Sequence, residues 1–248
     1  MSPPLKKKQK RSNNIKTLIS IIDAGEVKEL PRMPDFLDLK DPHNGSLGMP
    51  ALVTIEAVRA AAGDAVTLST AIGDAEYEPE FYANRAVDAA LAGADIVKVG
   101  LKNVSAEQAP WFLAAIRRSL DARAPYTRIV AGFYADLMDE ASLKKFPAAA
   151  QNAGVWGCLI DTYDKSGNRL GHYCGPETLA GFTADCRARG LKSALAGGLV
   201  EGDLVWLDEA DPDIVGFRSA VARGARGASG IDPKKVTDIF FAVDQLNR

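Results

Sequence analysis

Lysine and aspartate side chains stand at or just beyond the ends of three short apolar segments of this 248-residue sequence. The candidate catalytic residues are Asp38, Lys40, Lys98, Asp161 and Lys165. An uncharged lysine amine attacks carbonyl carbons, and a nearby carboxylate moves protons at the adjacent carbon or at a leaving hydroxyl. The residue types therefore indicate carbonyl chemistry, with an amine nucleophile and carboxylate acids and bases.

Such chemistry requires one of these lysines to lose its charge. Free lysine has a pKa of about 10.4, and lowering it to about 7 requires about 4 kcal/mol. Partial desolvation and neighbouring ammonium groups lower the pKa of a lysine, whereas nearby carboxylates raise it. The alternative is that the charges only meet solvent or pair as salt bridges. We favour a functional set, because interior lysines are costly unless they are paired.

Histidine and cysteine are scarce in this chain. The residues concerned are His43, His172, Cys158, Cys174 and Cys186. The sequence has no HExxH motif, no CxxC pair and no GxSxG nucleophile elbow. We therefore expect neither a zinc site nor a Ser/His/Asp triad, and we predict no metal and no cofactor.

The overall composition is that of an ordinary globular protein, with 47% hydrophobic and 25% charged residues. The net charge is −2 and the pI about 5.8, so no basic field attracts nucleic acid or anionic membranes. No apolar run approaches the roughly 20 residues that span a bilayer. We expect a cytoplasmic homo-oligomer that binds neither nucleic acid nor membranes. Residues 1–14 are predicted to form a flexible basic tail, and residues 15–248 a single domain.

Eight strand-length apolar segments alternate with longer helical patterns. They occupy residues 17–22, 35–40, 66–70, 95–99, 128–133, 157–161, 192–196 and 214–217. Most starts are separated by about 30 residues, the size of one βα unit. Eight such units predict a parallel sheet closed into a (β/α)8 TIM barrel, with an open doubly wound sheet as the alternative. In this barrel, catalytic residues lie at the C-terminal ends of the strands.

Glycine and proline mark the predicted ends of helices. Four glycines fall between a helical pattern and the next strand, where glycine supplies a left-handed turn. They are Gly63, Gly93, Gly154 and Gly190. Pro176 stands at the first position of a predicted helix, and the first helix, around residues 24–30, has room for only one or two turns.

Period-two alternation predicts which strand side chains enter the barrel. In the second segment Leu37 and Leu39 share one face, which must pack against the surrounding helices. Asp38 and Lys40 therefore point inward. The same alternation predicts that Lys98 in the fourth segment and Asp161 in the sixth segment also point inward. Lys165 follows in the loop after the sixth segment, above these side chains.

Glycine-rich sequence after the last two strands predicts a phosphate site. The candidate ligands there are Gly197, Gly198, Arg218 and Ser219, followed by the stretch RGARG at 223–227. These loops of TIM barrels often bind phosphate through backbone N–H groups, and an arginine can add a bidentate contact. Ser46, in the polar loop 41–48, is a further candidate substrate contact. Both loops have an alternative interpretation as plain turns.

Three stretches of the chain resemble the motifs of one enzyme family. Residues 38–48 read DLKDPHNGSLG and resemble a D-x-K-x-P-x-x-G-S-L-G signature. Residues 95–101, DIVKVGL, and 159–167, LIDTYDKSG, resemble a second lysine motif and an I-D-T-x-x-K-x-G motif. The family is (5-formylfuran-3-yl)methyl phosphate synthase, also called 4-(hydroxymethyl)-2-furancarboxaldehyde-phosphate synthase. The resemblance extends from about residue 18 to residue 226, although residues 217–224 fit its last loop only loosely.

This resemblance implies a cofactor-independent TIM barrel that acts in the biosynthesis of methanofuran- or methylofuran-type one-carbon carriers. It implies that two molecules of glyceraldehyde 3-phosphate condense to a furan aldehyde phosphate, with loss of phosphate and water. The family's catalytic positions map onto the five lysines and aspartates named above.

We expect a lyase in which Lys40 forms an imine with a triose carbonyl. Lys98 and Lys165 are expected to bind phosphate, lower the pKa of Lys40 or exchange protons, and Asp38 and Asp161 to serve as acid and base. One alternative is another Schiff-base sugar-phosphate aldolase or isomerase on the same barrel. A second alternative is a barrel that binds phosphorylated metabolites without catalysis.

Overall fold

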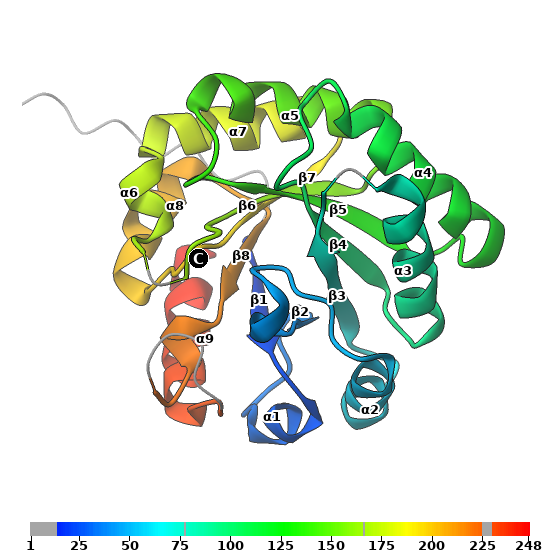
Figure 1. The fold of residues 1–248 in the computed structure, drawn as a ribbon. Helices are drawn as coiled ribbons and strands as arrows, with labels where there is room; N and C mark the ends of the chain where they lie inside the picture. Colours follow the sequence, from blue (N-terminus) through cyan, green and yellow to red (C-terminus); the bar gives the residue numbers. More distant parts are fainter. Residues whose placement is uncertain (1–13, 77, 166, 225–229) are drawn as a thin grey trace, which may run out of the picture.

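Parallel strands form a closed barrel that helices surround (Figure 1). The computed structural model describes residues 14–76, 78–165, 167–224 and 230–248. Within these residues the strands, each paired with the next and the last with the first, are β1 (Lys16–Ile21), β2 (Phe36–Leu39), β3 (Thr67–Asp74), β4 (Ile96–Gly100), β5 (Arg128–Tyr134), β6 (Gly157–Asp161), β7 (Lys192–Leu195) and β8 (Ile214–Phe217). All eight predicted strands are confirmed, and the sheet is a (β/α)8 TIM barrel rather than an open sheet.

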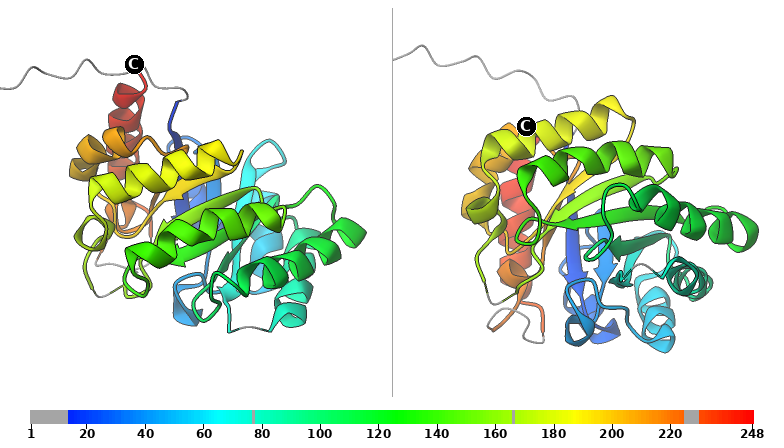
Figure 2. Two further views of the ribbon diagram at one scale, coloured as in Figure 1. Left: turned by 90° about the horizontal axis from the view of Figure 1, so that it is seen from above. Right: turned by 45° about the horizontal axis from the view of Figure 1, so that its top comes forward.

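The helices cover the outer face of the strands (Figures 1 and 2). They are α1 (Ala24–Glu29), α2 (Leu52–Ala62), α3 (Pro79–Leu91), α4 (Ala109–Arg123), α5 (Glu140–Asn152), α6 (Leu170–Tyr173), α7 (Pro176–Ala188), α8 (Leu204–Ala210) and α9 (Pro233–Leu246), with 3₁₀ turns η1 (Pro42–Asn44), η2 (Glu201–Asp203) and η3 (Ser219–Val221). The short first helix and the proline at the start of α7 are confirmed. The four glycines at which left-handed turns were predicted have φ between +68° and +112°, as such turns require.

Alternation along the strands separates two packing layers. Outward side chains such as Leu39 and Val99 are fully buried against the helices. Inward side chains, including Ile96 and Leu159, form a second apolar cluster inside the barrel. Because both faces are covered, the strands read as almost continuous apolar runs, and the predicted inward and outward faces are confirmed.

β3 departs from this alternation near its C-terminal end. Ala71 pairs with Lys98 of β4, whereas Asp74 pairs with Gly100, so three steps along β3 match two steps along β4. Gly73 lies at this irregularity with a φ of +122°. A bulge of this kind turns the side chain that follows it toward the other face of the sheet. It directs Asp74 toward the interior of the barrel mouth.

Two predicted features lie largely outside the described residues. Residues 1–13 of the basic tail are not among them, and neither are residues 225–229 of the glycine-rich loop after β8. Among the helices of the described segments, none combines the length and the apolar character that crossing a membrane requires.

Phe133 lies in the packed layer between the strands and the helices, so we expect Phe133→Ala to lower the free energy of unfolding strongly. The Phe133 ring is fully buried on β5 and stacks on Phe146 of α5, with the ring centroids 4.3 Å apart. Its removal leaves a cavity and should lower the free energy of unfolding by about 3–5 kcal/mol. Phe241→Ala, at a position of α9 that is 63% exposed, should change it by less than about 0.5 kcal/mol. Denaturant unfolding measures both, and equal losses would contradict this packing.

Candidate active site

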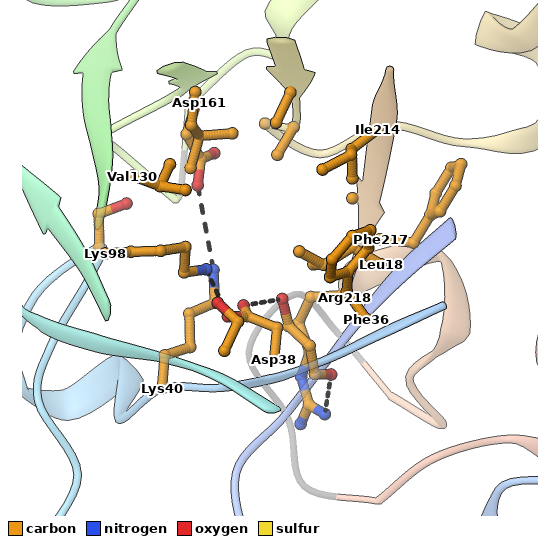
Figure 3. Close-up of a pocket in the computed structure, with 18 of the residues that line it drawn as sticks. Leu18, Phe36, Asp38, Lys40, Lys98, Val130, Asp161, Ile214, Phe217 and Arg218 are labelled. Atoms are coloured by element: carbon orange, nitrogen blue, oxygen red, sulfur yellow. Dashed lines mark hydrogen bonds and ion pairs between the residues drawn. The ribbon is translucent and has the colours of Figure 1, made fainter. Parts of the chain in front are cut away.

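A pocket opens at the C-terminal ends of the strands and contains every candidate residue predicted from the sequence (Figure 3). The lysines and aspartates among its lining residues are Asp38, Lys40, Lys98, Asp161 and Lys165. The candidates for phosphate or substrate binding are Ser46, Gly197, Gly198, Arg218 and Ser219. Within the described segments, no group of three or more His, Cys, Asp or Glu side chains is arranged to hold a metal ion. The ionisable groups that line the pocket are therefore chiefly amines and carboxylates.

Lys98 and Asp38 form a buried ion pair in this pocket. Lys98 Nζ lies 2.5 Å from Asp38 Oδ1, and the two side chains are 5% and 1% exposed. Ser20 of β1 and Ser69 of β3 donate hydrogen bonds to the Asp38 carboxylate, at 2.8 and 3.1 Å. Burial lowers the pKa of Lys98, against the opposing effect of Asp38 and with a further lowering by Lys40. The pocket wall therefore contains an amine that gives up its charge more readily than a free lysine.

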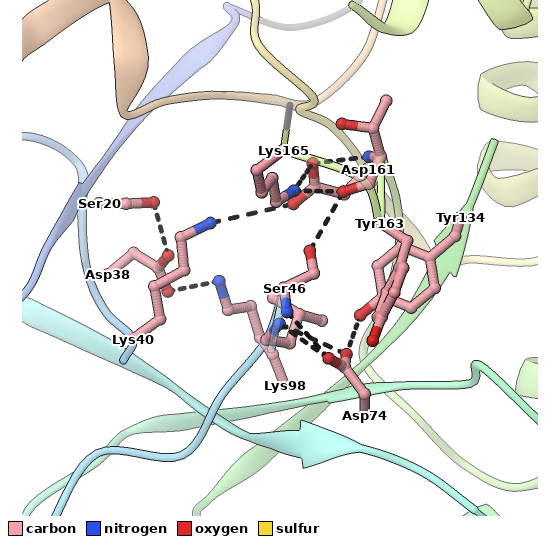
Figure 4. Close-up of polar contacts among 12 residues, drawn as sticks. Ser20, Asp38, Lys40, Ser46, Asp74, Lys98, Tyr134, Asp161, Tyr163 and Lys165 are labelled. Carbon is pink, nitrogen blue, oxygen red and sulfur yellow. Dashed lines mark hydrogen bonds and ion pairs between the residues drawn. The ribbon is translucent and has the colours of Figure 1, made fainter. Parts of the chain in front are cut away.

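Asp161 forms ion pairs with the other two lysines (Figure 4). Its Oδ1 accepts a hydrogen bond from Lys165 Nζ at 2.9 Å, and its Oδ2 lies 4.0 Å from Lys40 Nζ. The backbone N–H of Thr162 also donates to Oδ1, at 2.7 Å. Burial raises the pKa of Asp161, but the charges of Lys165 and Lys40 outweigh burial and lower this pKa to about 2. Asp161 is therefore an ionised carboxylate at neutral pH.

A second polar cluster holds one side of the pocket mouth, and the sequence analysis named only its Ser46. The Tyr134 hydroxyl donates a hydrogen bond to Asp74 Oδ1. The Asp74 carboxylate also accepts from the backbone N–H groups of Ser46 at 2.9 Å and Leu47 at 3.3 Å. The Ser46 hydroxyl donates to the backbone carbonyl of Thr162 at 3.1 Å. Burial raises the pKa of Asp74 and raises that of Tyr134 well above its usual value.

The sequence contains enough information to identify two of the site residues that were not predicted, but not the third. Ser20 and Ser69 lie on the inward-facing positions of their strands, so alternation alone could have placed them beside the candidate carboxylate. Asp74 is inward only because of the bulge in β3, and regular alternation from Ser69 places it outward. Gly73 directly before it is the only local signal of that bulge.

Arg218 lines the pocket, but its guanidinium is directed at a protein carboxylate. It donates two hydrogen bonds to Glu26 of α1, at 2.6 and 3.0 Å, and one to the carbonyl of Ser20 at 3.2 Å. Glu26 also accepts from the backbone N–H groups of Ile22 and Gly230, at 2.9 and 2.8 Å. Because β1 pairs with β8, the short α1 lies beside the end of β8. The pair of hydrogen bonds that Arg218 was expected to donate to phosphate is therefore donated to Glu26 in this structure.

The other predicted phosphate ligands lie at the pocket wall without bulky side chains. Gly197 and Gly198 follow β7 with φ of +106° and +68°, and Ser219 begins η3 after β8. Side chains of this size let a ligand approach the backbone closely. The predicted loop continues with Arg223, which forms an ion pair with Glu29 at 2.9 Å.

Below the charged residues the pocket is apolar. Leu18, Phe36, Ile96 and Leu159 each stand two positions before a residue of the polar layer, on the same inward face of their strands. Val130 and Ile214 complete this floor, and Figure 3 shows several of these side chains facing the cavity. The side chains of these six residues offer no hydrogen-bond partner to a ligand hydroxyl, and an unpaired hydroxyl is costly to bury. Trp156, which also lines the pocket, carries a single indole N–H donor.

Most of this chain is similar to the members of one known family. A family profile described as 4-HFC-P synthase matches residues 17–240. The (5-formylfuran-3-yl)methyl phosphate synthase of Methanosarcina mazei is 36% identical over 198 residues, covering 79% of this chain and 85% of that protein. That of Methanocaldococcus jannaschii is 34% identical over 227 residues, covering 90% and 97%. A solved 3-hexulose-6-phosphate synthase matches 92% of this chain and 99% of its own with a TM-score of 0.65, but its 16% identity shows only a shared fold.

The lowered pKa of Asp161 predicts a specific loss of stability in acid. A carboxyl whose pKa falls on folding stabilises the protein above its unfolded pKa, here 3.8, and this contribution disappears as the pH falls through the folded value of about 2. Asp161 should therefore account for a fall of about 2 kcal/mol in the free energy of unfolding between about pH 5 and pH 2.

Unfolding measured across this pH range in Asp161→Asn should lack that fall. Asp121→Asn is the control, because Asp121 is a 62% exposed carboxyl on α4, and it should keep the pH dependence of the wild type. Parallel curves for the wild type and Asp161→Asn would contradict the assignment.

Proposed function

This chain belongs to the 4-HFC-P synthase family, and we propose that it is the lyase that condenses two molecules of glyceraldehyde 3-phosphate to 4-(hydroxymethyl)-2-furancarboxaldehyde phosphate. One phosphate and two waters leave, and no oxidant or reductant is needed. We place the reaction in methanofuran- or methylofuran-type biosynthesis. One observation carries the proposal: three lysine amines surround two carboxylates in a single pocket of an enzyme of this family.

Lys40 is assigned as the imine-forming nucleophile. Its Nζ lies 4.0 Å from Asp161, whereas Lys98 and Lys165 form ion pairs of 2.5 and 2.9 Å. The Lys40 amine therefore has the loosest of these three pairs and moves to a substrate at the smallest cost. It adds to a triose carbonyl and expels water, which gives the imine. Loss of a proton from the adjacent carbon gives an enamine, whose carbon bonds to the aldehyde carbon of the second triose.

Lys98 is assigned as the group that accepts this proton. Burial lowers its pKa, so its amine is more readily available as a base than an exposed lysine. Asp38 at 2.5 Å stabilises the ammonium that forms. The remaining pair, Lys165 with Asp161, lies nearer the mouth, where Lys165 is 34% exposed. After the carbon–carbon bond has formed, a hydroxyl closes the furan ring, and C–O bonds break to release one phosphate and two waters. Lys165 is assigned to protonate the oxygens that leave in these steps, and a further water, equal to the one expelled on imine formation, hydrolyses the final imine to free Lys40.

The apolar floor supports a dehydrated product. A sugar phosphate keeps several hydroxyls, and each needs a hydrogen-bond partner when buried. A furan ring has lost these hydroxyls and presents a flat surface with little hydrogen-bonding capacity. A floor of Leu18, Phe36, Ile96, Val130, Leu159 and Ile214 suits that ring better than it suits a polyol. Phosphate binding is assigned to the turn at Gly197 and Gly198 together with Ser219.

Incubation of the purified protein with glyceraldehyde 3-phosphate and no added metal tests the reaction. A furan aldehyde absorbs in the near ultraviolet, whereas triose and hexose phosphates do not. We expect this absorbance to rise, with one inorganic phosphate released per furan formed. Lys40→Ala should reduce the rate by more than about 10³-fold, as for other residues that form covalent intermediates. A hexose phosphate without furan would indicate an aldolase and contradict the proposal.

Borohydride trapping tests the role of Lys40. Reduction in the presence of substrate should leave a triose adduct on Lys40, which peptide mass spectrometry locates. Lys40→Ala should lose the adduct, and Lys145→Ala, at an exposed position of α5, should keep it. An adduct on Lys98 would reverse the assigned roles, and absence of an adduct with Lys40→Ala still active would exclude the imine at this position.

A further inference from the structure

The loop that joins β2 to α2 is folded into the mouth of the barrel. Leu47 is fully buried and belongs to the apolar cluster inside the barrel, with Tyr134 and Leu159. Ser46 is only 3% exposed. Loops at the top of a barrel normally run over the surface, so a loop with buried residues needs internal partners for its backbone.

Asp74 supplies those partners from the bulge of β3. Its carboxylate accepts hydrogen bonds from the consecutive backbone N–H groups of Ser46 and Leu47, and from the Tyr134 hydroxyl (Figure 4). One side chain thus satisfies two backbone donors of the buried loop and the hydroxyl of a buried tyrosine. The loop is therefore fixed to β3 and β5 through one side chain.

Two glycines on neighbouring strands provide the space for this arrangement. A Cβ atom at Gly100 of β4 would overlap both the Tyr134 hydroxyl and the Asp74 carboxylate. A Cβ atom at Gly132 of β5 would lie 2.8 Å from Leu47 Cδ1, closer than real contacts. The hydrogen bond between Tyr134 and Asp74 therefore requires glycine at position 100, and the buried position of Leu47 requires glycine at position 132.

The fixed loop reaches the opposite side of the mouth through Ser46. Its hydroxyl donates to the carbonyl oxygen of Thr162 at 3.1 Å, and Lys165 Nζ donates to this same oxygen. Lys165 Nζ also donates to Asp161 at 2.9 Å. The position of the Thr162 carbonyl therefore helps to decide where the Lys165 ammonium lies.

The Tyr134 ring contacts the same segment directly. It packs edge-on against Tyr163, with the ring centroids 5.4 Å apart. Tyr163 is also held by its backbone N–H, which donates to Asp136 at 2.7 Å. Tyr134 is thus connected to two loops. Its hydroxyl bonds to Asp74, which holds the loop after β2, and its ring contacts Tyr163 in the loop after β6.

We infer that Asp74 and Tyr134 are positioning residues: their hydrogen-bonded pair holds the loop after β2 so that Ser46 fixes the Thr162 carbonyl and, through it, Lys165. Neither side chain is among the described residues that line the pocket, so both act through others. The inference rests on the proposed function, in which Lys165 protonates a leaving oxygen after the Lys40 imine has formed.

Tyr134→Phe removes the hydroxyl and keeps the buried ring. Misplacement of a reacting group by about 1 Å costs up to about 10²-fold in rate, so we expect kcat for furan formation to fall about ten- to a hundredfold. KM should stay within about twofold, because the loss concerns a step after binding. The borohydride adduct on Lys40 should form as in the wild type. Asp74→Asn, which keeps the shape of the side chain, should lower kcat in the same direction.

Thr183→Val is the matched control. The Thr183 side chain on α7 is also buried, its hydroxyl donates to the backbone carbonyls of Ala180 and Ala210, and it is not among the described residues that line the pocket. This variant should keep kcat within about twofold of the wild type while losing a buried hydrogen bond. A fall in kcat equal to that of Tyr134→Phe would show a general structural effect and overturn the inference.

A double-mutant cycle tests the connection through Ser46. If Tyr134 and Ser46 act along one line of contacts, the double variant Tyr134→Phe/Ser46→Ala should be little slower than the slower single variant. Effects that multiply would overturn the inference, and so would an unchanged kcat in Tyr134→Phe. Absence of furan formation by the wild type would instead contradict the proposed function, so the two failures are distinguishable.

Discussion

The buried ion pair between Lys98 and Asp38 constrains most of the site. Two charges leave water here, and their attraction offsets that cost only if the remaining hydrogen-bonding positions are satisfied. The strand register supplies this, because Ser20, Asp38 and Ser69 are direct partners across β1, β2 and β3. Both serines therefore face the carboxylate and donate to it. Lys98 is the register partner of Ala71, whose small side chain leaves room for the lysine to reach across β3.

A layered interior follows from the same geometry. Inward side chains of neighbouring strands fall at similar heights, so the polar layer rests on an apolar layer one step nearer the N-terminal ends of the strands. The apolar layer excludes water from below the lysines, and the carboxylates form ion pairs with the amines. Burial and neighbouring charge thus oppose each other at Lys98, while charge dominates at Asp161. The different environments separate an amine suited to accept protons from a carboxylate that stays ionised.

The sequence predicted the strands, their inward faces and the assembly of the catalytic candidates, because all of these follow from period-two alternation and the repeat of βα units. It did not predict Asp74, because the bulge in β3 reverses the face on which that residue lies. It also assigned Arg218 to phosphate alone. The pairing with Glu26 depends on how closely the six-residue α1 packs beside β8, which is a tertiary relation between segments nearly 200 residues apart. Departures of this kind arise from local irregularity or long-range packing, which no local pattern contains.

A titration of the lysine side chains by nuclear magnetic resonance, followed at Cε and Nζ in the otherwise unmodified protein, measures whether the barrel interior produces an uncharged amine. Lys98→Met identifies the signal of Lys98 by its disappearance, and the exposed Lys145 on α5 provides a reference in the same spectrum. We predict that Lys98 loses its proton at a lower pH than Lys145 and below the value of about 10.4 for free lysine. Titration of Lys98 at or above that value would show that Asp38 outweighs burial, and would contradict the assignment of Lys98 as the base.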